Sequence, residues 1–258
     1  MDAMVVGISV RQFSPKYRSA DERKHRLADI GGTAMKIVTL ATQKGGATKT
    51  TLCRHLAVAA HLDGFRTAIL DTDQQGGSRD WGATRLSRGY GPPEVYHELS
   101  PNEDHLKAAL AAIKAKGTEI VFVDTPGSLN GPIALNASRA ADHVLVPMRP
   151  TADDIKALPP FIAHLRREKV SFSVVVSAAV TNTSRPKTEA LAYLEASKLP
   201  YLGAVIHQKS VIPETLISGQ TVFEISGLTD AEQKSVDEFR AVYEWVRDKI
   251  ALKHRVAG

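Results

Sequence analysis

The sequence predicts an α/β fold in which helices cover both faces of a mainly parallel, twisted sheet. The first observation is an alternation: from Met35 onward, short apolar segments of strand type are followed by longer segments with helical spacing. The second is size, because 258 residues are enough for one α/β domain with a full core. The third is composition, since 43% hydrophobic and 24% charged residues are ordinary values for a soluble globular protein.

Six apolar segments are expected to form the strands of this sheet. The first of them precedes a glycine-rich turn and a helix, so the domain opens with a strand, a turn and a helix. Strands that alternate with helices along a chain pair in parallel and are buried on both faces. In chain order, the expected strands are Lys36–Ala41, Thr67–Leu70, Glu119–Val123, His143–Val146, Phe172–Ala178 and Tyr201–Ile206.

Helices are expected in the connections between these strands. In the segment after the second strand, apolar residues at helical spacing place Leu106, Leu110 and Ile113 on one face. Pro159-Pro160 is expected to kink or split the helix that contains it, because proline lacks the N–H that a helix interior needs. The expected helices are one through Leu52 and Ala60 that ends near Gly64, then Asp104–Lys116, Asp153–Glu168 and Lys187–Ser197.

The last helix has the clearest start signal. Thr229 to Glu232 has the pattern of a capping box, in which each side chain bonds the backbone of the other residue. An apolar stripe follows, and we expect it to pack on the domain. A membrane-surface helix is the alternative, because the tail Lys249–Arg255 is basic, but this tail lacks bulky apolar residues. The stripe consists of Val236, Phe239, Tyr243, Val246 and Ile250.

Residues 1–34 differ from the rest of the chain. They carry charges of both signs with a small basic excess, show little periodicity, and end shortly after Gly31-Gly32. We predict a mostly disordered basic arm, for which DNA contact is one possible role. The alternative is that translation begins at Met35 and that the segment is an upstream mis-start. Residues 35–258 are predicted to form a single domain.

The overall charge and the single cysteine restrict the class of protein. A formal net charge of +5 permits binding to phosphate polymers or to anionic lipid without requiring either. No apolar run approaches the roughly 20 residues that span a bilayer, and the N-terminus does not read as a secretory signal. Cys53 is the single cysteine, which excludes an intramolecular disulfide and fits a reducing cytosol.

A glycine-rich segment between the first strand and its helix carries the strongest chemical signal. A strand, a glycine-rich turn, a Lys-Thr pair and a helix together form the arrangement of a phosphate-binding loop. Lys49 would reach the β- and γ-phosphates, and the Thr50 hydroxyl would complete the coordination of Mg²⁺. A plain glycine turn is the alternative. The segment consists of Lys44, Gly45, Gly46, Ala47, Thr48, Lys49, Thr50 and Thr51.

This segment departs from the general phosphate-loop pattern, because Gln43 and Thr48 stand where that pattern has glycine. It resembles the deviant Walker A motif of the ParA/MinD family of P-loop ATPases, which has a second lysine at the loop start, matched here by Lys44. The resemblance implies that residues 35–258 are one P-loop ATPase domain that uses ATP and Mg²⁺. Thr48 departs from the family pattern too. If its backbone is left-handed, its side chain costs about 1–2 kcal/mol and could lower affinity or turnover.

The second lysine has a physical use in this family. It reaches across a dimer interface to the nucleotide of the partner subunit and offsets charge that develops on the transferred phosphoryl group. By resemblance, Lys44, Lys49 and Asp73 are therefore the expected catalytic residues. A solvated loop lysine is the alternative for Lys44.

Two acidic segments match the family in order and spacing. Asp71 and Asp73 follow the second strand and resemble the switch segment of the family, with Gln74 in place of its proline. The resemblance places Asp71 near Mg²⁺ and makes Asp73 the residue that orients the attacking water. Asp124 ends the Glu119–Val123 strand and resembles the Walker B aspartate, so Thr50, Asp71 and Asp124 are the expected metal site. A hydrogen-bonded aspartate at a strand end is the alternative.

The resemblance extends from Met35 to roughly Ile250. Within the family, the chain resembles the small plasmid-partition members. It implies an ATPase that dimerises with ATP, binds non-specific double-stranded DNA in that state, and is released when an adaptor protein stimulates hydrolysis. Arg185 and Lys209 lie where the family places basic residues that contact DNA. The family implies a cytoplasmic, nucleoid-associated bacterial protein, with no membrane partner expected. A MinD-like membrane-cycling ATPase and a hydrolysis-deficient nucleotide-binding scaffold are the alternatives.

Overall fold

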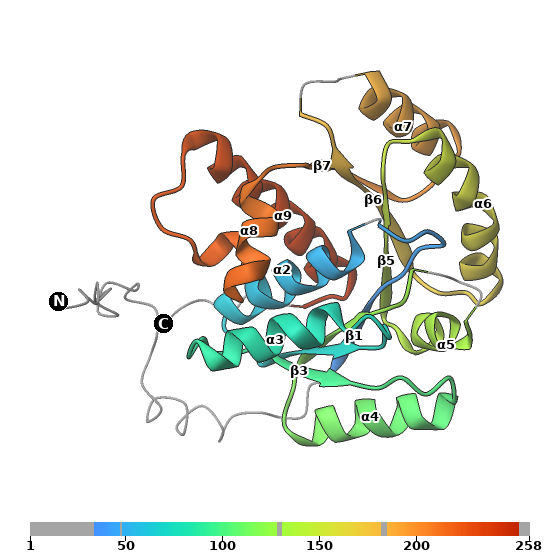
Figure 1. Ribbon diagram of the computed structural model, residues 1–258. Coiled ribbons are helices and arrows are strands. Elements are labelled where there is room, and N and C mark those ends of the chain that lie inside the picture. Colours follow the sequence, from blue (N-terminus) through green and yellow to red (C-terminus); the bar gives the residue numbers. More distant parts are fainter. Residues whose placement is uncertain (1–33, 47, 128–130, 182–184, 253–258) are drawn as a thin grey trace. The chain divides into compact units, whose positions relative to one another are not determined.

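Seven parallel strands form a single sheet in the part of the chain that the structure describes. The computed structural model describes residues 34–46, 48–127, 131–181 and 185–252. The strand order is β3-β2-β4-β1-β5-β6-β7, and every pair of neighbours is parallel (Figure 1). The strands are β1 Lys36–Leu40, β2 Thr67–Asp71, β3 Glu94–His97, β4 Ile120–Asp124, β5 His143–Met148, β6 Phe172–Ala179 and β7 Tyr201–His207.

Helices cover both faces of this sheet, as the sequence predicts. Alternate residues of β4 point to opposite faces: Ile120 and Phe122 pack on the side of α2, whereas Val121 and Val123 pack on the side of α4. Helices α2, α3, α8 and α9 lie on the first face, and α4 to α7 lie on the second. The helices are α2 Lys49–Leu62, α3 Gly77–Ser87, α4 Glu103–Ala115, α5 Pro132–Ala140, α6 Ala152–Arg167, α7 Arg185–Ala196, α8 Val211–Ser218 and α9 Asp230–Lys249, with a 3₁₀ turn η3 at Val222–Glu224.

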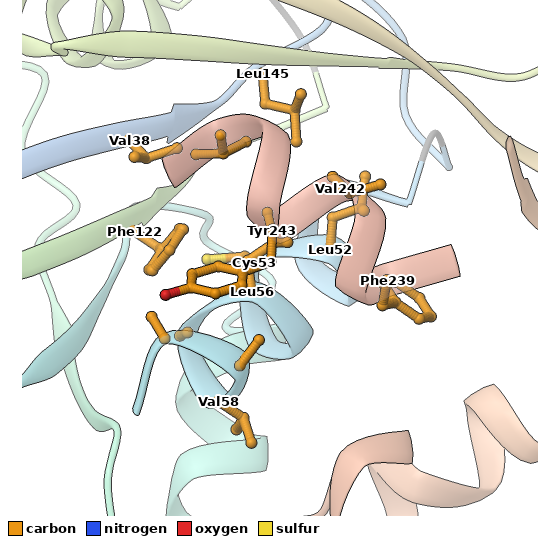
Figure 2. Close-up of a cluster of buried hydrophobic side chains, with 14 of the residues drawn as sticks. Val38, Leu52, Cys53, Leu56, Val58, Phe122, Leu145, Phe239, Val242 and Tyr243 are labelled. Carbon is orange, nitrogen blue, oxygen red and sulfur yellow. The ribbon is translucent and has the colours of Figure 1, made fainter. Parts of the chain in front are cut away.

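Helix α2 is buried between the sheet and α9. Figure 2 shows Leu52, Cys53 and Leu56 of α2 beside Tyr243 of α9, and all four side chains are at most 1% exposed. Removing a large buried side chain from such a core costs about 2–5 kcal/mol. Because α2 starts directly after the glycine-rich loop, this packing fixes the position of Lys49 and of the loop before it.

Helix α6 runs unbroken through Pro159 and Pro160, so the helix does not split there, which was one of the two expected effects of the prolines. Both prolines lie on the exposed side of the helix, where the carbonyl groups that they leave unbonded can bond water. Leu158, Phe161 and Leu165 hold the other side of the helix in the core. The packing of this apolar face therefore outweighs the two lost hydrogen bonds.

Helix α9 confirms the predicted packing stripe. Phe239, Tyr243, Val246 and Ile250 are each at most 4% exposed, and Val236 packs against the same cluster. The capping box at Thr229 is present. The basic tail beyond Leu252 and the predicted arm before Ala34 lie outside the described residues, so the predictions for them stand as predictions. In the described helices, none has both the length and the apolar character to cross a membrane.

His55 is a buried histidine that links α2 to η3 and α9. Its Nδ1 lies 2.7 Å from the Thr51 carbonyl oxygen, its Nε2 accepts the Val222 N–H at 3.4 Å, and its ring stacks on Phe239 with centroids 3.9 Å apart. Burial lowers the pKa of His55 to about 4, against the raising effect of the Thr51 hydrogen bond. Neutral His55 is therefore the form that belongs to the folded state.

We expect the stability of the protein to fall as the pH is lowered from 6.5 to 4. In this range the unfolded chain takes up a proton on His55 that the folded chain excludes, so acid favours unfolding. A shift from 6.5 to about 4 corresponds to about 3 kcal/mol. The measurement is urea unfolding at pH 7 and pH 4.5 of wild type and of His55→Gln. An equal loss of stability in both proteins would contradict the assignment to His55.

Candidate nucleotide-binding site

The carboxyl ends of β1, β2 and β4 bring the predicted site residues together. The loop from Thr42 to Thr48 follows β1, Asp71 ends β2, and Asp124 ends β4. In the register of the sheet, Asp71 and Asp124 are direct partners on neighbouring strands. This edge is where ligands of open, parallel α/β sheets bind.

The glycine-rich loop turns twice through left-handed backbone. Gly46 has φ 74° and Thr48 has φ 62° with ψ 15°, and Thr48 is the N-cap of α2. Backbone that alternates between right- and left-handed conformations turns successive N–H groups toward one point, which forms an anion-binding nest. Gly127 packs against the start of this loop so tightly that a Cβ there would lie 2.7 Å from the Gly45 Cα. Ala47 lies outside the described residues.

Thr48 has the left-handed backbone in which a threonine side chain is strained. A β-branched residue in the left-handed region raises the energy of the folded loop by about 1–2 kcal/mol. Its hydroxyl does not cap α2, unlike that of a threonine N-cap in extended backbone. Capping of α2 by the Thr48 hydroxyl therefore does not offset this strain.

Lys49 is a buried lysine directly behind the loop. It is 5% exposed, and its Nζ donates to the Lys44 carbonyl oxygen at 3.4 Å. Burial lowers the pKa of Lys49, while the charges of Asp124 and Asp73 raise it. A buried ammonium whose hydrogen bond to this carbonyl is long is poised for a stronger anionic partner at the loop.

Asp124 is the centre of the acidic group. It is fully buried, its Oδ1 accepts the Thr50 hydroxyl at 3.2 Å, and its Oδ2 accepts the Ser78 hydroxyl at 2.8 Å. Burial and the nearby charge of Asp71 raise the pKa of Asp124 to about 6, against the lowering effects of Ser78, Thr50 and Arg54. Two carboxylates at this depth need a cation for full ionisation.

The residues fit a magnesium ion. Mg²⁺ in nucleotide sites is held by one or two carboxylates together with waters and substrate phosphates. Within the described residues, no group of three or more His, Cys, Asp or Glu side chains could hold a metal ion alone. Both oxygens of Asp71 already accept backbone N–H groups, from Asp73 at 3.0 Å and Arg79 at 2.8 Å. Thr50 and Asp124 are therefore the candidates for direct contact, with Asp71 behind them.

Asp73 is more accessible than the other two aspartates. Its side chain is partly exposed, and its Oδ1 accepts the Gln75 N–H at 3.0 Å within the turn that leads to α3. This position suits a group that must meet a ligand arriving from solvent.

The comparison with protein families follows this geometry. Residues 38–222 match the model of the CobQ/CobB/MinD/ParA nucleotide-binding domain. This match includes the glycine-rich loop and the three aspartates. The chain belongs to this family. The ParA/MinD resemblance of the sequence is thereby confirmed.

Three curated family members illustrate the range of relatives. IncC of Escherichia coli is 28% identical over 88% of this chain and 73% of its own length. A maintenance of carboxysome distribution protein A of Halothiobacillus neapolitanus is 25% identical over 73% of this chain and 87% of its own length. The chromosome-partitioning ATPase Soj of Thermus thermophilus is 27% identical over 53% of this chain and 64% of its own length.

A solved structure confirms the fold. The septum site-determining protein MinD of Pyrococcus horikoshii, in complex with Mg-ADP, aligns with a TM-score of 0.65 at 19% identity. The alignment covers 85% of this chain and 98% of that protein. The parallel sheet with helices on both faces is therefore the fold of this family.

In the present protein, two aspartates in the first turn of α6 pair with basic side chains beside the glycine-rich loop. Lys44 Nζ lies 3.3 Å from Asp153 Oδ2, and both side chains are accessible. Arg149 binds Asp154 through Nε at 3.1 Å and Nη2 at 2.9 Å, and its Nη1 lies 3.4 Å from the place of a Cβ on Gly46. The sequence reasoning missed the Lys44–Asp153 pair, because more than 100 residues separate Lys44 from its partner.

Arg54 is a second residue that the sequence reasoning missed. It lies one turn after Thr50 on α2 and is 5% exposed. In the described part of the chain, its buried Nε has no hydrogen-bond partner. Burial lowers the pKa of Arg54, whereas the charges of Asp124 and Asp71 raise it. Its charge partly offsets the buried aspartates.

The structure separates the two candidates for DNA contact. The Arg185 side chain is 89% exposed at the start of α7 and pairs with Glu189 one turn later. The Lys209 side chain is 13% exposed, and its Nζ donates to Glu238 at 3.2 Å. Arg185 is therefore accessible to a large polyanion, whereas Lys209 is already engaged by a carboxylate.

Proposed function

We propose that this family member is an ATPase that dimerises with ATP, binds double-stranded DNA without sequence preference in that state, and is released by adaptor-stimulated hydrolysis. The observation that carries the proposal is the meeting of the glycine-rich loop, buried Lys49 and buried Asp124 at one edge of the sheet. A phosphate group with a divalent cation would complete this charge arrangement.

The site residues divide the chemistry among them. Lys49 and the loop N–H groups would hold the β- and γ-phosphates, while Thr50 and Asp124 would contact Mg²⁺ with Asp71 behind them. The ion would neutralise charge on the phosphates. Asp73 orients the attacking water, and Lys44 leaves Asp153 to reach the nucleotide of the partner subunit. Hydrolysis then requires dimerisation, and the released dimer returns to monomers.

The named relatives support a role in positioning large objects. Soj is named as a chromosome-partitioning ATPase, and the Halothiobacillus protein as one that maintains carboxysome distribution. The accessible Arg185 at the start of α7 favours DNA as the binding partner, because phosphate polymers are bound through exposed Lys and Arg.

Binding to scrambled duplex DNA with Mg-ATP and with Mg-ADP, each at two salt concentrations, tests the proposal. We expect binding with Mg-ATP that weakens strongly at the higher salt concentration, and little binding with Mg-ADP. Absence of binding in both states would contradict the DNA proposal. Equal binding in both states would contradict the nucleotide switch.

Arg185→Ala is expected to weaken DNA binding and to lower the slope of log affinity against log salt by about 1, because one phosphate contact is lost. The accessible side chain pairs with the exposed Glu189, so the fold should be unaffected. Lys209→Ala is the matched control, which should change DNA binding less than Arg185→Ala because Lys209 already pairs with Glu238. Electrophoretic mobility shifts at several salt concentrations measure both. The reverse ranking would contradict this assignment.

A further inference from the structure

The hydroxyl of Thr48 contacts a strand on the far side of the loop. Thr48 Oγ1 donates to Ser177 Oγ at 2.7 Å, although 129 residues separate them. Ser177 is fully buried near the carboxyl end of β6. This is a direct side-chain bond between the glycine-rich loop and a strand that carries none of the motifs.

The backbone of β6 is deformed at this point. The parallel register with β7 shifts between Val176 and Ala179, and Ala178 has φ 52°. An irregularity of this kind re-aims a side chain, and left-handed alanine persists only where surrounding contacts hold it. Ala178 and Thr48 are therefore two left-handed residues without the freedom of glycine, and the hydroxyl bond lies between their segments.

We propose that Ser177 is a positioning residue of the nucleotide site, which holds the loop in its phosphate-binding shape in place of the glycine that Thr48 replaces. Glycine adopts left-handed backbone without strain, whereas threonine needs an opposing contact. The Ser177 hydroxyl supplies that contact, and it orients the Thr48 peptide from which α2 and Lys49 continue. Thr48 and Ser177 thus form a matched pair. The inference rests on the proposed function, because it assumes that this loop binds nucleotide.

A matched pair predicts effects that depend on each other. Ser177→Ala should weaken the binding of nucleotide about fivefold, because the strained Thr48 then loses the hydrogen bond to the Ser177 hydroxyl. Thr48→Val should weaken binding similarly, since it keeps the β-branch and loses the hydroxyl. Thr48→Gly should bind more tightly than wild type, because it removes the strain together with the need for Ser177. The double variant Thr48→Gly with Ser177→Ala should lie within about twofold of Thr48→Gly.

Calorimetric titration with a non-hydrolysable ATP analogue and Mg²⁺ measures these affinities without hydrolysis. Ser138→Ala is the control, because Ser138 is also fully buried but bonds the Ala134 carbonyl oxygen within α5. It should bind as wild type does. Because Thr48→Val leaves β6 untouched, it keeps the test intact if Ser177→Ala does not fold.

The outcomes separate this inference from the proposed function. Wild-type protein that binds no analogue would contradict the proposed function, and the positioning role with it. Wild-type binding that Ser177→Ala and Thr48→Val leave unchanged would contradict the positioning role alone. If Ser177→Ala causes the same loss of affinity in the Thr48→Gly background as in wild type, that result would also overturn it, because independent residues show no coupling. Rescue of Ser177→Ala by Thr48→Gly would support it.

Discussion

Lys49→Met is expected to weaken nucleotide binding about 100-fold. The ammonium of Lys49 is buried beside the glycine-rich loop, where its hydrogen bond to the Lys44 carbonyl oxygen is 3.4 Å long. Hydrogen bonds to charged groups contribute about 1.5–3 kcal/mol each, and a phosphate would receive more than one from this group. Methionine keeps the aliphatic stem in the core, so the loss reports the charge and not the packing.

Lys36→Met provides the control for this substitution. Lys36 lies at the opposite end of β1, where its Nζ pairs with Asp142 at 3.4 Å in a partly exposed ion pair. Exposed pairs contribute about 0–1 kcal/mol, so this variant should bind nucleotide as wild type does. Calorimetry with Mg-ADP measures both variants. Wild-type affinity in Lys49→Met would contradict the assignment of the loop as the phosphate site.

Lys44→Ala is expected to bind ATP within a few-fold of wild type and to lose hydrolysis by about 1,000-fold. The side chain pairs with Asp153 in its own subunit. Under the proposed function, it contributes to catalysis only when it reaches the partner's nucleotide. Asp73→Asn should bind ATP and lose hydrolysis for a different reason, because it cannot orient the water.

Mixing these two inactive variants tests the action across the dimer. In a mixed dimer, the Lys44→Ala subunit keeps Asp73 and receives Lys44 from the Asp73→Asn subunit. Random pairing gives mixed dimers half of the time with one working site of two, so roughly a quarter of the wild-type rate should return. A phosphate-release assay measures the rate. No recovery, with dimers shown to form, would contradict action of Lys44 in the partner's site.

The strands that carry the site could be predicted because they are buried on both faces. Continuous apolar runs such as Ile120–Val123 predict strands that are buried on both faces. The aspartates that follow these runs mark the carboxyl edge of the sheet. Strand β3 was missed because it is four residues long, lies at the edge and is partly exposed. Helix α3 was missed because its buried face consists of Ser78, Trp81 and Arg85, which gives no apolar periodicity.

The parts of the site that depend on strand order could not be predicted. Ser78 bonds Asp124, and Ser177 bonds Thr48, through contacts between residues that are 46 and 129 positions apart. Ser177 stands in no recognisable motif, because a single hydroxyl has no sequence pattern. Ser78 begins a segment that resembles partition-type family members, but nothing in that segment indicates a bond to Asp124. By contrast, the sequence raised left-handed backbone at Thr48 as a condition, because the general pattern has glycine there, and the structure shows φ 62°.

Sedimentation of Asp73→Asn with Mg-ATP, with Mg-ADP and without nucleotide tests the central claim most directly, which is that ATP drives dimerisation. This variant should hold ATP without hydrolysing it, so the ATP state lasts through the measurement. We predict a dimer with Mg-ATP and a monomer in the other two conditions. The same oligomeric state in all three conditions, with ATP binding verified, would contradict the account.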